Sequence, residues 1–363
     1  MRQLPFYAPL KSPDHPTPSG DRQIARSLLT ILSDSDRGVQ ATLASSLRSY
    51  EKHGQATAQA KLRKQAEAEV ARLVPLGREN GWPLWVTYHN YYKAPDLIGP
   101  AVSRALGIPY VLIEASRAPK RLVGPWAAFE QAAQTASDHA ALHFYFTEHD
   151  AEQLLAARTQ GQQLVHLRPF LPRQSLPPAK PAAPSNKLVT MAMMRPANKL
   201  ASYLRLSETL PLIKAPDWTL TIIGTGTEEA AVKQAFAPFG SKITYKSMLP
   251  PDQIEHELSR HALFLWPGID EAFGMSYIEA QAQGLAVVAE HRSGVREVVE
   301  PSGLTPPDSP QLYADKITEL MLNPDKLVAA QQAARDKVVA HHLLPAARRT
   351  IWAALDTLLD TQP

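Results

Sequence analysis

Two glutamates on either side of a glycine are the residues best placed to do chemistry. Glu271 lies in a loop, and Glu279 lies within the helix that follows Gly274. The first N–H groups of a helix have no partner within it and favour a phosphate, so we expect Gly274, Met275 and Ser276 to bind one. Carboxylates repel a phosphate unless they face hydroxyl groups. The pattern predicts a site for a phosphorylated ligand with hydroxyl groups, although two surface glutamates beside a capped helix would give the same residues.

A pair of cations precedes this motif. Arg195 and Lys199 follow the strand expected over 188–191, in the loop that leads to the next helix. Two cations at this position can neutralise a departing diphosphate, and such charge stabilisation is usually the main catalytic contribution when no metal takes part. A solvated pair at a helix start is the alternative.

The segment over 266–289 resembles the Glu-x7-Glu signature of the retaining GT4 glycosyltransferases, also called glycosyl transferases group 1, which have the GT-B fold. The resemblance implies that Glu279 holds the ribose hydroxyls of a nucleotide-sugar donor. It also implies that Glu271 holds the donor sugar, and that Phe273 and the helix start at Gly274 line the diphosphate and the sugar.

The same resemblance extends to the neighbouring loops. Arg195 and Lys199 resemble the pair that stabilises the departing nucleoside diphosphate in this family. Gly224 and Gly226 resemble the glycine turn after the second strand of the donor domain, although such a turn serves packing as often as phosphate binding. Met248 lies in the following loop, which would contact the base.

The first half of the chain contributes three further candidates. Gly20 lies in a loop that, in the family, reaches the donor diphosphate and the acceptor but usually carries two consecutive glycines. His89 follows one predicted strand, and Glu114 follows the next. Many relatives have a histidine after that later strand, where it bonds the donor sugar, and this chain has Glu114 there. Both side chains are catalytic candidates, neither is assigned as a base, and an ordinary structural role for His89 is an equal alternative.

Short apolar runs alternate with helical patterns in both halves of the chain. A helix returns the chain between parallel strands, so we expect two Rossmann-like, doubly wound parallel-sheet domains that face a central cleft. The resemblance implies that this architecture is the GT-B fold. The strands are expected over 4–8, 40–44, 84–88, 110–113, 142–147, 188–191, 220–223, 243–245, 263–266 and 286–289. The helices are expected over 21–33, 58–74, 96–106, 125–136, 149–158, 199–213, 227–237, 252–259, 275–283, 311–322, 326–340 and 345–360.

A proline-rich segment divides the chain near its middle. Six prolines within residues 169–184 cannot donate backbone hydrogen bonds, so this stretch should be extended. We predict an acceptor-side domain over 1–172, a linker over 173–186 and a donor-binding domain over 187–345. The final segment, 346–363, is expected to form a helix that packs back on the first domain.

The composition excludes several other classes of protein. The chain has no cysteine, a formal net charge of +3 and a pI near 8.9. The basic residues are spread along the chain, so we expect no nucleic-acid partner. No stretch reaches the about 18 apolar residues that a membrane span needs. We expect a cytoplasmic protein, for which peripheral contact with an anionic membrane stays open.

Together these features predict a hexosyltransferase that needs neither a metal nor another cofactor. It would move a hexose from a UDP- or GDP-sugar to a hydroxyl acceptor, a glycan or glycolipid precursor of the cell envelope, with the retention that the resemblance implies. Two alternatives stay open. A nucleotide-sugar epimerase of the same shape would need acid and base carboxylates around the sugar, and a binding module would keep the pocket without transfer.

The Asp-x-Asp at Asp34 to Asp36 ends the first helix, away from the strand ends, and predicts no metal site.

Overall fold

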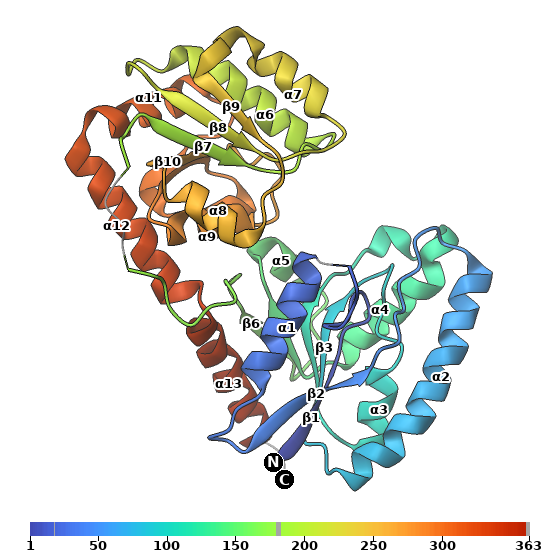
Figure 1. Ribbon diagram of the computed structural model, residues 1–363. Coiled ribbons are helices and arrows are strands. Elements are labelled where there is room, and N and C mark those ends of the chain that lie inside the picture. The colour runs from blue at the N-terminus through green and yellow to red at the C-terminus, as the bar shows by residue number, and fades with distance from the viewer. Residues whose placement is uncertain (18, 179–182, 361–363) are drawn as a thin grey trace. The chain divides into compact units, whose positions relative to one another are not determined.

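The computed structural model describes residues 1–17, 19–178 and 183–360, which form two compact units (Figure 1). The first unit contains Met1–Leu167 and the C-terminal helix from Ala347 onward, and the second contains Arg168–Ala346. None of the helices in these described ranges combines the length and the apolar character that a bilayer span requires. Each unit is built on one parallel sheet.

The sheet of the first unit has the strand order β2-β1-β3-β4-β5-β6, with every pair parallel. Its strands are β1 (Arg2–Tyr7), β2 (Val39–Ser45), β3 (Trp85–Asn90), β4 (Tyr110–Ala115), β5 (Leu142–Tyr145) and β6 (Gln163–His166). The chain steps from β1 outward to β2 and then returns to add β3 on the other side of β1. The loops after β1 and β3 therefore flank a topological switch point, where ligands of open α/β sheets bind.

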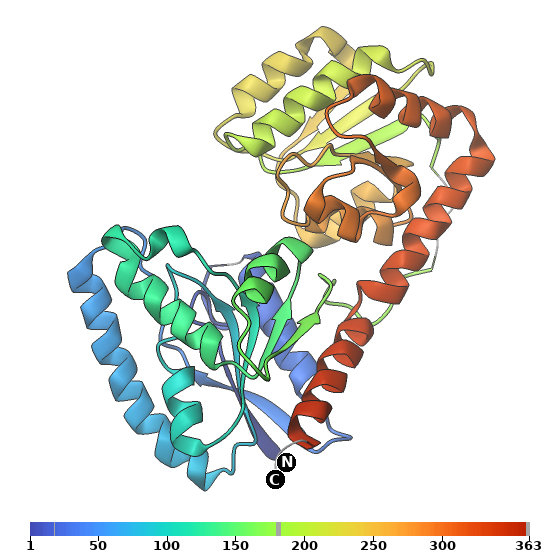
Figure 2. The ribbon, with the colours of Figure 1, turned by 180° about the vertical axis from the view of Figure 1, so that it is seen from behind.

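Helices cover both faces of this sheet (Figures 1 and 2). Along one face, α2, α3 and α4 pack side by side. The last helix packs beside the first, because the Trp352 indole N–H donates to the Ile31 carbonyl at 2.9 Å and Arg348 donates to the Thr30 carbonyl at 3.0 Å. The helices are α1 (Gly20–Leu32), α2 (Ala56–Glu79), α3 (Gly99–Leu106), α4 (Ala127–His139), α5 (Glu148–Ala156) and α13 (Leu344–Asp360).

The sheet of the second unit has the order β12-β11-β10-β7-β8-β9, again with parallel pairs. Its strands are β7 (Lys187–Met191), β8 (Thr219–Ile223), β9 (Ile243–Lys246), β10 (Leu263–Leu265), β11 (Ala286–Glu290) and β12 (Leu304–Thr305). The chain runs outward from β7 to β9 and then returns to place β10 on the other side of β7. The loops after β7 and β10 flank the switch point of this sheet.

Two helical layers enclose the second sheet. In one layer α6 packs between α7 and α11, and in the other α9 packs against α12. The buried face of each strand is almost wholly apolar, as expected for strands covered on both sides. The helices are α6 (Asn198–Thr209), α7 (Glu229–Phe236), α8 (Pro251–Leu258), α9 (Met275–Ala282), α10 (Ser293–Val298), α11 (Pro310–Leu322) and α12 (Pro324–His341).

The predicted fold class, two doubly wound parallel sheets, is confirmed. Three short elements, β6, β12 and α10, were not predicted, because β6 is a half-buried edge strand without an apolar run and the other two span only a few residues. Strand β5 ends two residues before its predicted limit because Thr147 caps α5 by accepting a hydrogen bond from the Asp150 N–H at 3.1 Å. Helix α6 gives way to a 3-10 turn at Pro211.

The chain passes between the units at Leu167–Arg168 and at Ala346–Ala347. Arg168 and the residues that follow pack with the second unit, where the Leu171 N–H donates to the His342 carbonyl at 2.8 Å and the Leu344 N–H donates to the Arg173 carbonyl at 3.1 Å. Leu171 is buried in the core of that unit. Part of the predicted linker, residues 179–182, lies outside the described residues.

Candidate active site

Lys199 and Glu271 meet at the switch point of the second sheet. Lys199 lies at the start of α6, after β7, and Glu271 lies in the loop after the adjacent strand β10. The Lys199 ammonium forms an ion pair with the Glu271 carboxylate and lies 5.5 Å from the centre of the Trp266 ring. The Trp266 indole N–H donates to the same carboxylate at 3.2 Å. One cation and one carboxylate are thus held together where ligands of such sheets bind.

The loop that carries Glu271 is fixed by its neighbours. The Ile269 N–H donates to the Ser202 hydroxyl oxygen at 3.0 Å, and the Tyr277 hydroxyl donates to the Trp266 carbonyl at 3.0 Å. A Cβ atom at Gly294 would lie 1.6 Å from the Ala272 carbonyl oxygen, so only a glycine in α10 lets the loop lie this close. The position of the Glu271 carboxylate is therefore set by packing.

Helix α9 begins beside this carboxylate. Gly274 is its N-cap with φ of 66°, and a Cβ there would lie 2.7 Å from the Tyr277 ring and 3.0 Å from Cγ of Glu271. No side chain caps the helix, so the backbone N–H groups of its first turn, at Met275 and Ser276, face no capping side chain. An anion at this helix start would be favoured by those N–H groups and by the helix dipole.

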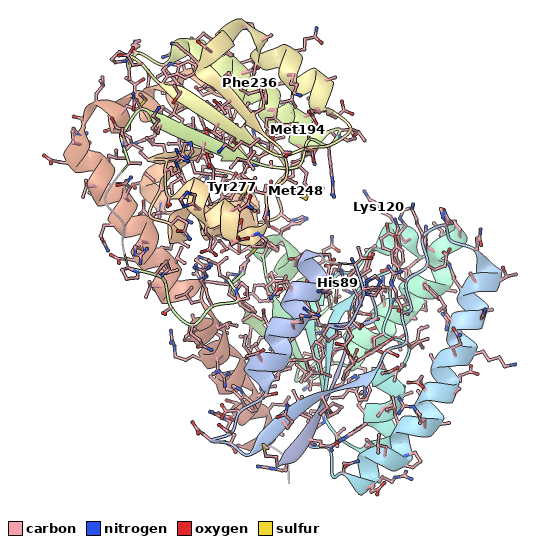
Figure 3. The ribbon with its side chains drawn as sticks, viewed as in Figure 1. His89, Lys120, Met194, Phe236, Met248 and Tyr277 are labelled. Carbon is pink, nitrogen blue, oxygen red and sulfur yellow. The ribbon has the colours of Figure 1, made fainter. Side chains whose placement is uncertain are left out.

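Gly224, Gly226 and Met248 lie in loops that follow β8 and β9. Gly224 and Gly226 bring the β7 and β8 loops into contact, because a Cβ at either glycine would lie 2.0 Å from a carbonyl oxygen, that of Ala192 or of Met194. The structure therefore gives these two glycines a packing role. Met248 is 65% exposed in the loop after β9 (Figure 3).

The two predicted cations are placed differently. Whereas Lys199 is paired with Glu271, Arg195 is exposed in the loop before α6. Its backbone is held by a hydrogen bond from its N–H to the Met193 carbonyl at 3.0 Å, and no ion pair joins its guanidinium to a residue of the described ranges. Convergence of Arg195 and Lys199 on one diphosphate remains a prediction. Phe273 is partly buried against the core beneath the loop.

Glu279 lies further along α9 and is partly buried. Burial, and to a lesser extent the negative charge of Glu255, raise the pKa of its carboxyl to about 7 against the opposing effect of Arg173. Arg173 is itself in an ion pair with Glu255. A carboxyl group in this position changes its charge near neutral pH, which matters for any hydroxyl group it binds.

In the first unit, His89 and Glu114 are brought together with an unpredicted residue, Asp21. The Nδ1 atom of His89 lies 3.5 Å from Oε2 of Glu114 and 3.6 Å from Oδ1 of Asp21. Asp21 lies in the first turn of α1, the helix after β1, and His89 is the penultimate residue of β3, so the group lies at the switch point of this sheet. Burial raises the pKa of Glu114, against the opposing effect of His89. Figure 3 shows where His89 lies in this unit.

The backbone at this place is strained. His89 and Glu114 have φ values of 69° and 60°, which residues with a side chain rarely adopt. Such conformations cost of order 1–3 kcal/mol each and concentrate at functional sites. The Nδ1 atom of His89 is buried and forms no hydrogen bond with the described residues. The first unit thus holds a histidine between two carboxylates at the ligand-binding edge of its sheet.

Gly20, the first residue of α1, lies beside this group in sequence. The helix is capped by Ser19, whose hydroxyl oxygen accepts the Arg22 N–H at 3.3 Å. A Cβ at Gly20 would meet nothing within 4 Å, so packing does not require a glycine here. Arg22 is occupied by a hydrogen bond to the His15 carbonyl at 2.8 Å, which orders the loop before α1.

Several residues that shape these sites were not predicted from the sequence. Trp266 and Ser202 fix Glu271, and Asp21 lies 3.6 Å from Nδ1 of His89. The signal for Asp21 was its place at the start of the helix that follows the first strand. Asp34, from the Asp-x-Asp segment, accepts the backbone N–H groups of Asp36 and Arg37 at 3.0 and 3.1 Å and so stabilises a turn. Among the residues described, no group of three or more possible metal ligands is clustered.

Two doubly wound parallel units, each with polar side chains at its switch point, define a protein of the GT-B architecture. Residues 179–337 match the sequence model of the family described as Glycosyl transferases group 1. Over this segment the chain is similar to the family, GT4.

Two curated relatives and one solved structure illustrate the similarity. The chain is 27% identical over 135 residues to 2-deoxystreptamine glucosyltransferase of Streptomyces kanamyceticus, covering 35% of each protein. It is 29% identical over 127 residues to GDP-mannose-dependent monoacylated alpha-(1-6)-phosphatidylinositol monomannoside mannosyltransferase of Corynebacterium glutamicum, covering 32% of each. These matches span about a third of each relative. The structure of HepE of Anabaena in complex with UDP covers 98% of this chain and 100% of its own, with a TM-score of 0.68 and 16% identity.

Proposed function

We propose that this chain is a retaining, metal-independent hexosyltransferase that moves a hexose from a nucleoside-diphosphate sugar to a hydroxyl acceptor. The observation that carries the proposal is the meeting of Lys199, Glu271 and the uncapped start of α9 at the switch point of the second unit. This point lies within the segment that matches the family. The second unit binds the donor in this proposal, and the first unit binds the acceptor.

The donor is a UDP- or GDP-hexose. Support comes from the relatives, since one is named as a glucosyltransferase, one as dependent on GDP-mannose, and HepE was solved with UDP. Glu279 holds the ribose hydroxyls and Glu271 holds hydroxyl groups of the hexose. Exposed Met248, in the loop after β9, lies against the base. Gly20 gives the donor diphosphate or the acceptor room beside the first unit.

The reaction breaks the bond between the anomeric carbon and the diphosphate oxygen, and that oxygen keeps the electron pair. A new bond forms between the anomeric carbon and the acceptor oxygen, whose proton is lost to the departing phosphate. Lys199 and Arg195 stabilise the developing negative charge together with the N–H groups at Gly274, Met275 and Ser276. These groups supply the positive charge that other transferases take from a metal. Bound diphosphate competes with Glu271 for Lys199 and frees the Glu271 carboxylate for the sugar.

The first unit positions the acceptor. His89, held between Asp21 and Glu114, bonds the reacting hydroxyl and orients it toward the sugar. The acceptor is a glycan or glycolipid precursor of the cell envelope, and the enzyme works in the cytoplasm, where peripheral contact with a membrane would bring it to such an acceptor.

Incubation of the purified chain with UDP-glucose, UDP-galactose and GDP-mannose, with and without EDTA, tests the proposal. We expect release of free UDP or GDP that depends on an added acceptor and is unchanged by EDTA. Interconversion of the sugars without release of nucleotide would identify an epimerase. Thermal stabilisation by a nucleotide sugar without turnover would identify a binding module.

A further inference from the structure

Three loops of the first unit converge on a set of aromatic and basic side chains, which we call the cation–aromatic cluster. It consists of Arg48, Tyr50, Tyr91, Tyr92, Lys93, Arg121 and Trp126. The loops are joined by backbone and side-chain hydrogen bonds, from the Glu51 N–H to the Lys93 carbonyl at 2.8 Å and from the Gln59 amide to the Pro125 carbonyl at 2.9 Å. Three segments far apart in sequence therefore present these residues together.

The cations of the cluster lie on aromatic rings. The Lys93 ammonium is 5.6 Å from the centre of the Tyr92 ring and 5.7 Å from that of Trp126, and the Arg121 guanidinium is 5.3 Å from Tyr92. The Arg48 guanidinium is 4.5 Å from the centre of Tyr50. A ring attracts a cation through its quadrupole but leaves the positive charge uncompensated. The rings therefore hold these cations in place without neutralising them.

Two carboxylates near the cluster, those of Glu51 and Glu130, are occupied by other partners. None of Arg48, Lys93 and Arg121 forms an ion pair with a carboxylate in the described part of the chain. The Glu51 carboxylate accepts backbone N–H groups, including that of His53 at 2.9 Å. The buried Glu130 carboxylate accepts the Ala118 N–H at 2.7 Å. This leaves a local excess of positive charge in a chain whose net charge is only +3.

The cluster is continuous with the site at His89. Ring centres follow one another at 5.0 Å from His89 to Tyr91, at 5.5 Å from Tyr91 to Tyr92 and at 5.3 Å from Tyr92 to Trp126. Two ring steps, a span that one or two pyranose rings can bridge, therefore separate His89 from the ring that carries Lys93 and Arg121. Figure 3 shows His89 and Lys120, the neighbour of Arg121, at the same end of the first unit.

We propose that the cation–aromatic cluster binds an anionic group, a carboxylate or a phosphate carried on a saccharide acceptor whose reacting hydroxyl lies at His89. The inference rests on the proposed function, since it names the class of acceptor. Arg121 offers a planar fork of N–H donors for a carboxylate or phosphate, and Lys93 adds a point charge. The anionic group fixes one end of the acceptor while His89 contacts the other.

The test compares acidic and neutral saccharides. Cellobiouronic acid and glucose 6-phosphate are titrated against the full chain by saturation-transfer NMR, beside cellobiose and glucose. We expect the acidic ligands to bind at least about tenfold more tightly, as loss of one charge-assisted hydrogen bond would give. The double variant K93Q/R121Q should lose this preference. The matched variant K61Q/R349Q, which removes the same charge from exposed positions of the same unit, should keep it.

Three outcomes would overturn the inference. Equal binding of acidic and neutral saccharides, or an acidic preference that survives K93Q/R121Q, would mean that the cluster does not recognise the anion. Binding to phosphatidylglycerol vesicles without binding of the acidic saccharides would assign the cluster to a membrane surface. UDP and GDP binding is measured in the same samples. If neither nucleotide binds while the acidic saccharides do, the proposed function fails and the anion site stands.

Discussion

Lys199 is paired with Glu271 across the switch point of the second sheet, and the Trp266 indole N–H donates to the same carboxylate at 3.2 Å. The three groups come from two loops that follow adjacent parallel strands. An opposite charge keeps the ammonium in place until an anion of higher charge arrives. The ion pair thus holds the Lys199 ammonium at the place where the leaving diphosphate is expected.

Substitution K199A should lower kcat about 10²- to 10³-fold, because it removes one group that stabilises charge in the transition state. The fold should persist, since Lys199 is partly exposed and such ion pairs contribute about 1 kcal/mol or less. Steady-state kinetics of nucleotide release and a thermal melt measure the two effects. K233A, which breaks the exposed pair with Glu229, is the control and should leave kcat unchanged. A K199A enzyme with the wild-type kcat would refute the assigned role.

Donor binding should depend on pH through Glu279. Because burial raises the pKa of this carboxyl from 4.5 to about 7, it is protonated below that pH and ionised above it. The ionised form accepts hydrogen bonds from ribose hydroxyls more strongly, so the donor Kd should fall as the pH rises from about 6 to about 8. Titration of UDP or GDP across this range measures the effect, and E279Q should remove it.

The raised pKa of Glu279 should also make the stability of the protein depend on pH. The folded-state pKa of Glu279 lies above its ordinary value, so its contribution to stability is complete below pH 4.5 and is lost as the pH rises through about 7. The matched variant E255Q removes the neighbouring charge that raises this pKa and should move the transition to lower pH. Denaturant unfolding at several pH values tests this, and an unchanged midpoint in E255Q would argue against the coupling.

Substitutions at Gly294 and Gly20 should distinguish a glycine required for packing from one required for ligand binding. In G294A the new Cβ would lie 1.6 Å from the Ala272 carbonyl oxygen, so the Glu271 loop must shift, at a cost of about 1–3 kcal/mol in the free energy of unfolding. Activity should fall with it. In G20A nothing lies within 4 Å of the new Cβ, so stability should stay unchanged and only ligand affinity should fall. Equal stability losses in the two variants would show that this view of the glycines is mistaken.

Substitution H89A should impair the acceptor half of the reaction. Loss of a group that orients the reacting hydroxyl costs about 10²-fold or more in kcat/KM for the acceptor. Nucleotide affinity, which depends on the second unit in our proposal, should not change. H53A removes an exposed histidine of the same unit and is the control. If H89A retained full transfer activity, His89 would have only a structural role.

Much of the fold was predictable because most of the strands are apolar runs and helical patterns separate them. The fold class and the elements after β7 and β10 followed from this alternation, and so did the loops that carry Lys199 and Glu271. Short pieces such as β12 were not predictable, since two residues carry no pattern. Their placement depends on tertiary hydrogen bonds, such as that of the His291 N–H to the Thr305 carbonyl at 2.7 Å.

The sequence indicated which residues form the candidate site, but it did not indicate which of them contact one another. Sequence spacing indicated Glu271 and Lys199, but not that they pair with each other or that Trp266 joins them. These contacts join the segments that follow β7 and β10. The two strands are neighbours in the sheet but far apart in the sequence, so the sequence alone does not show the contact. For Gly224 and Gly226 the motif was compatible with both ligand binding and packing. The structure shows that both glycines allow close backbone packing.

The central claim is that Lys199 and the start of α9 bind a diphosphate. Calorimetric titration of the full chain with UDP and UMP, and with GDP and GMP, tests it most directly. The account predicts that wild type prefers the diphosphate of at least one pair, and that K199Q loses about tenfold of that preference. Equal affinity of wild type for the diphosphate and the monophosphate in both pairs, or a preference that persists undiminished in K199Q, would contradict it.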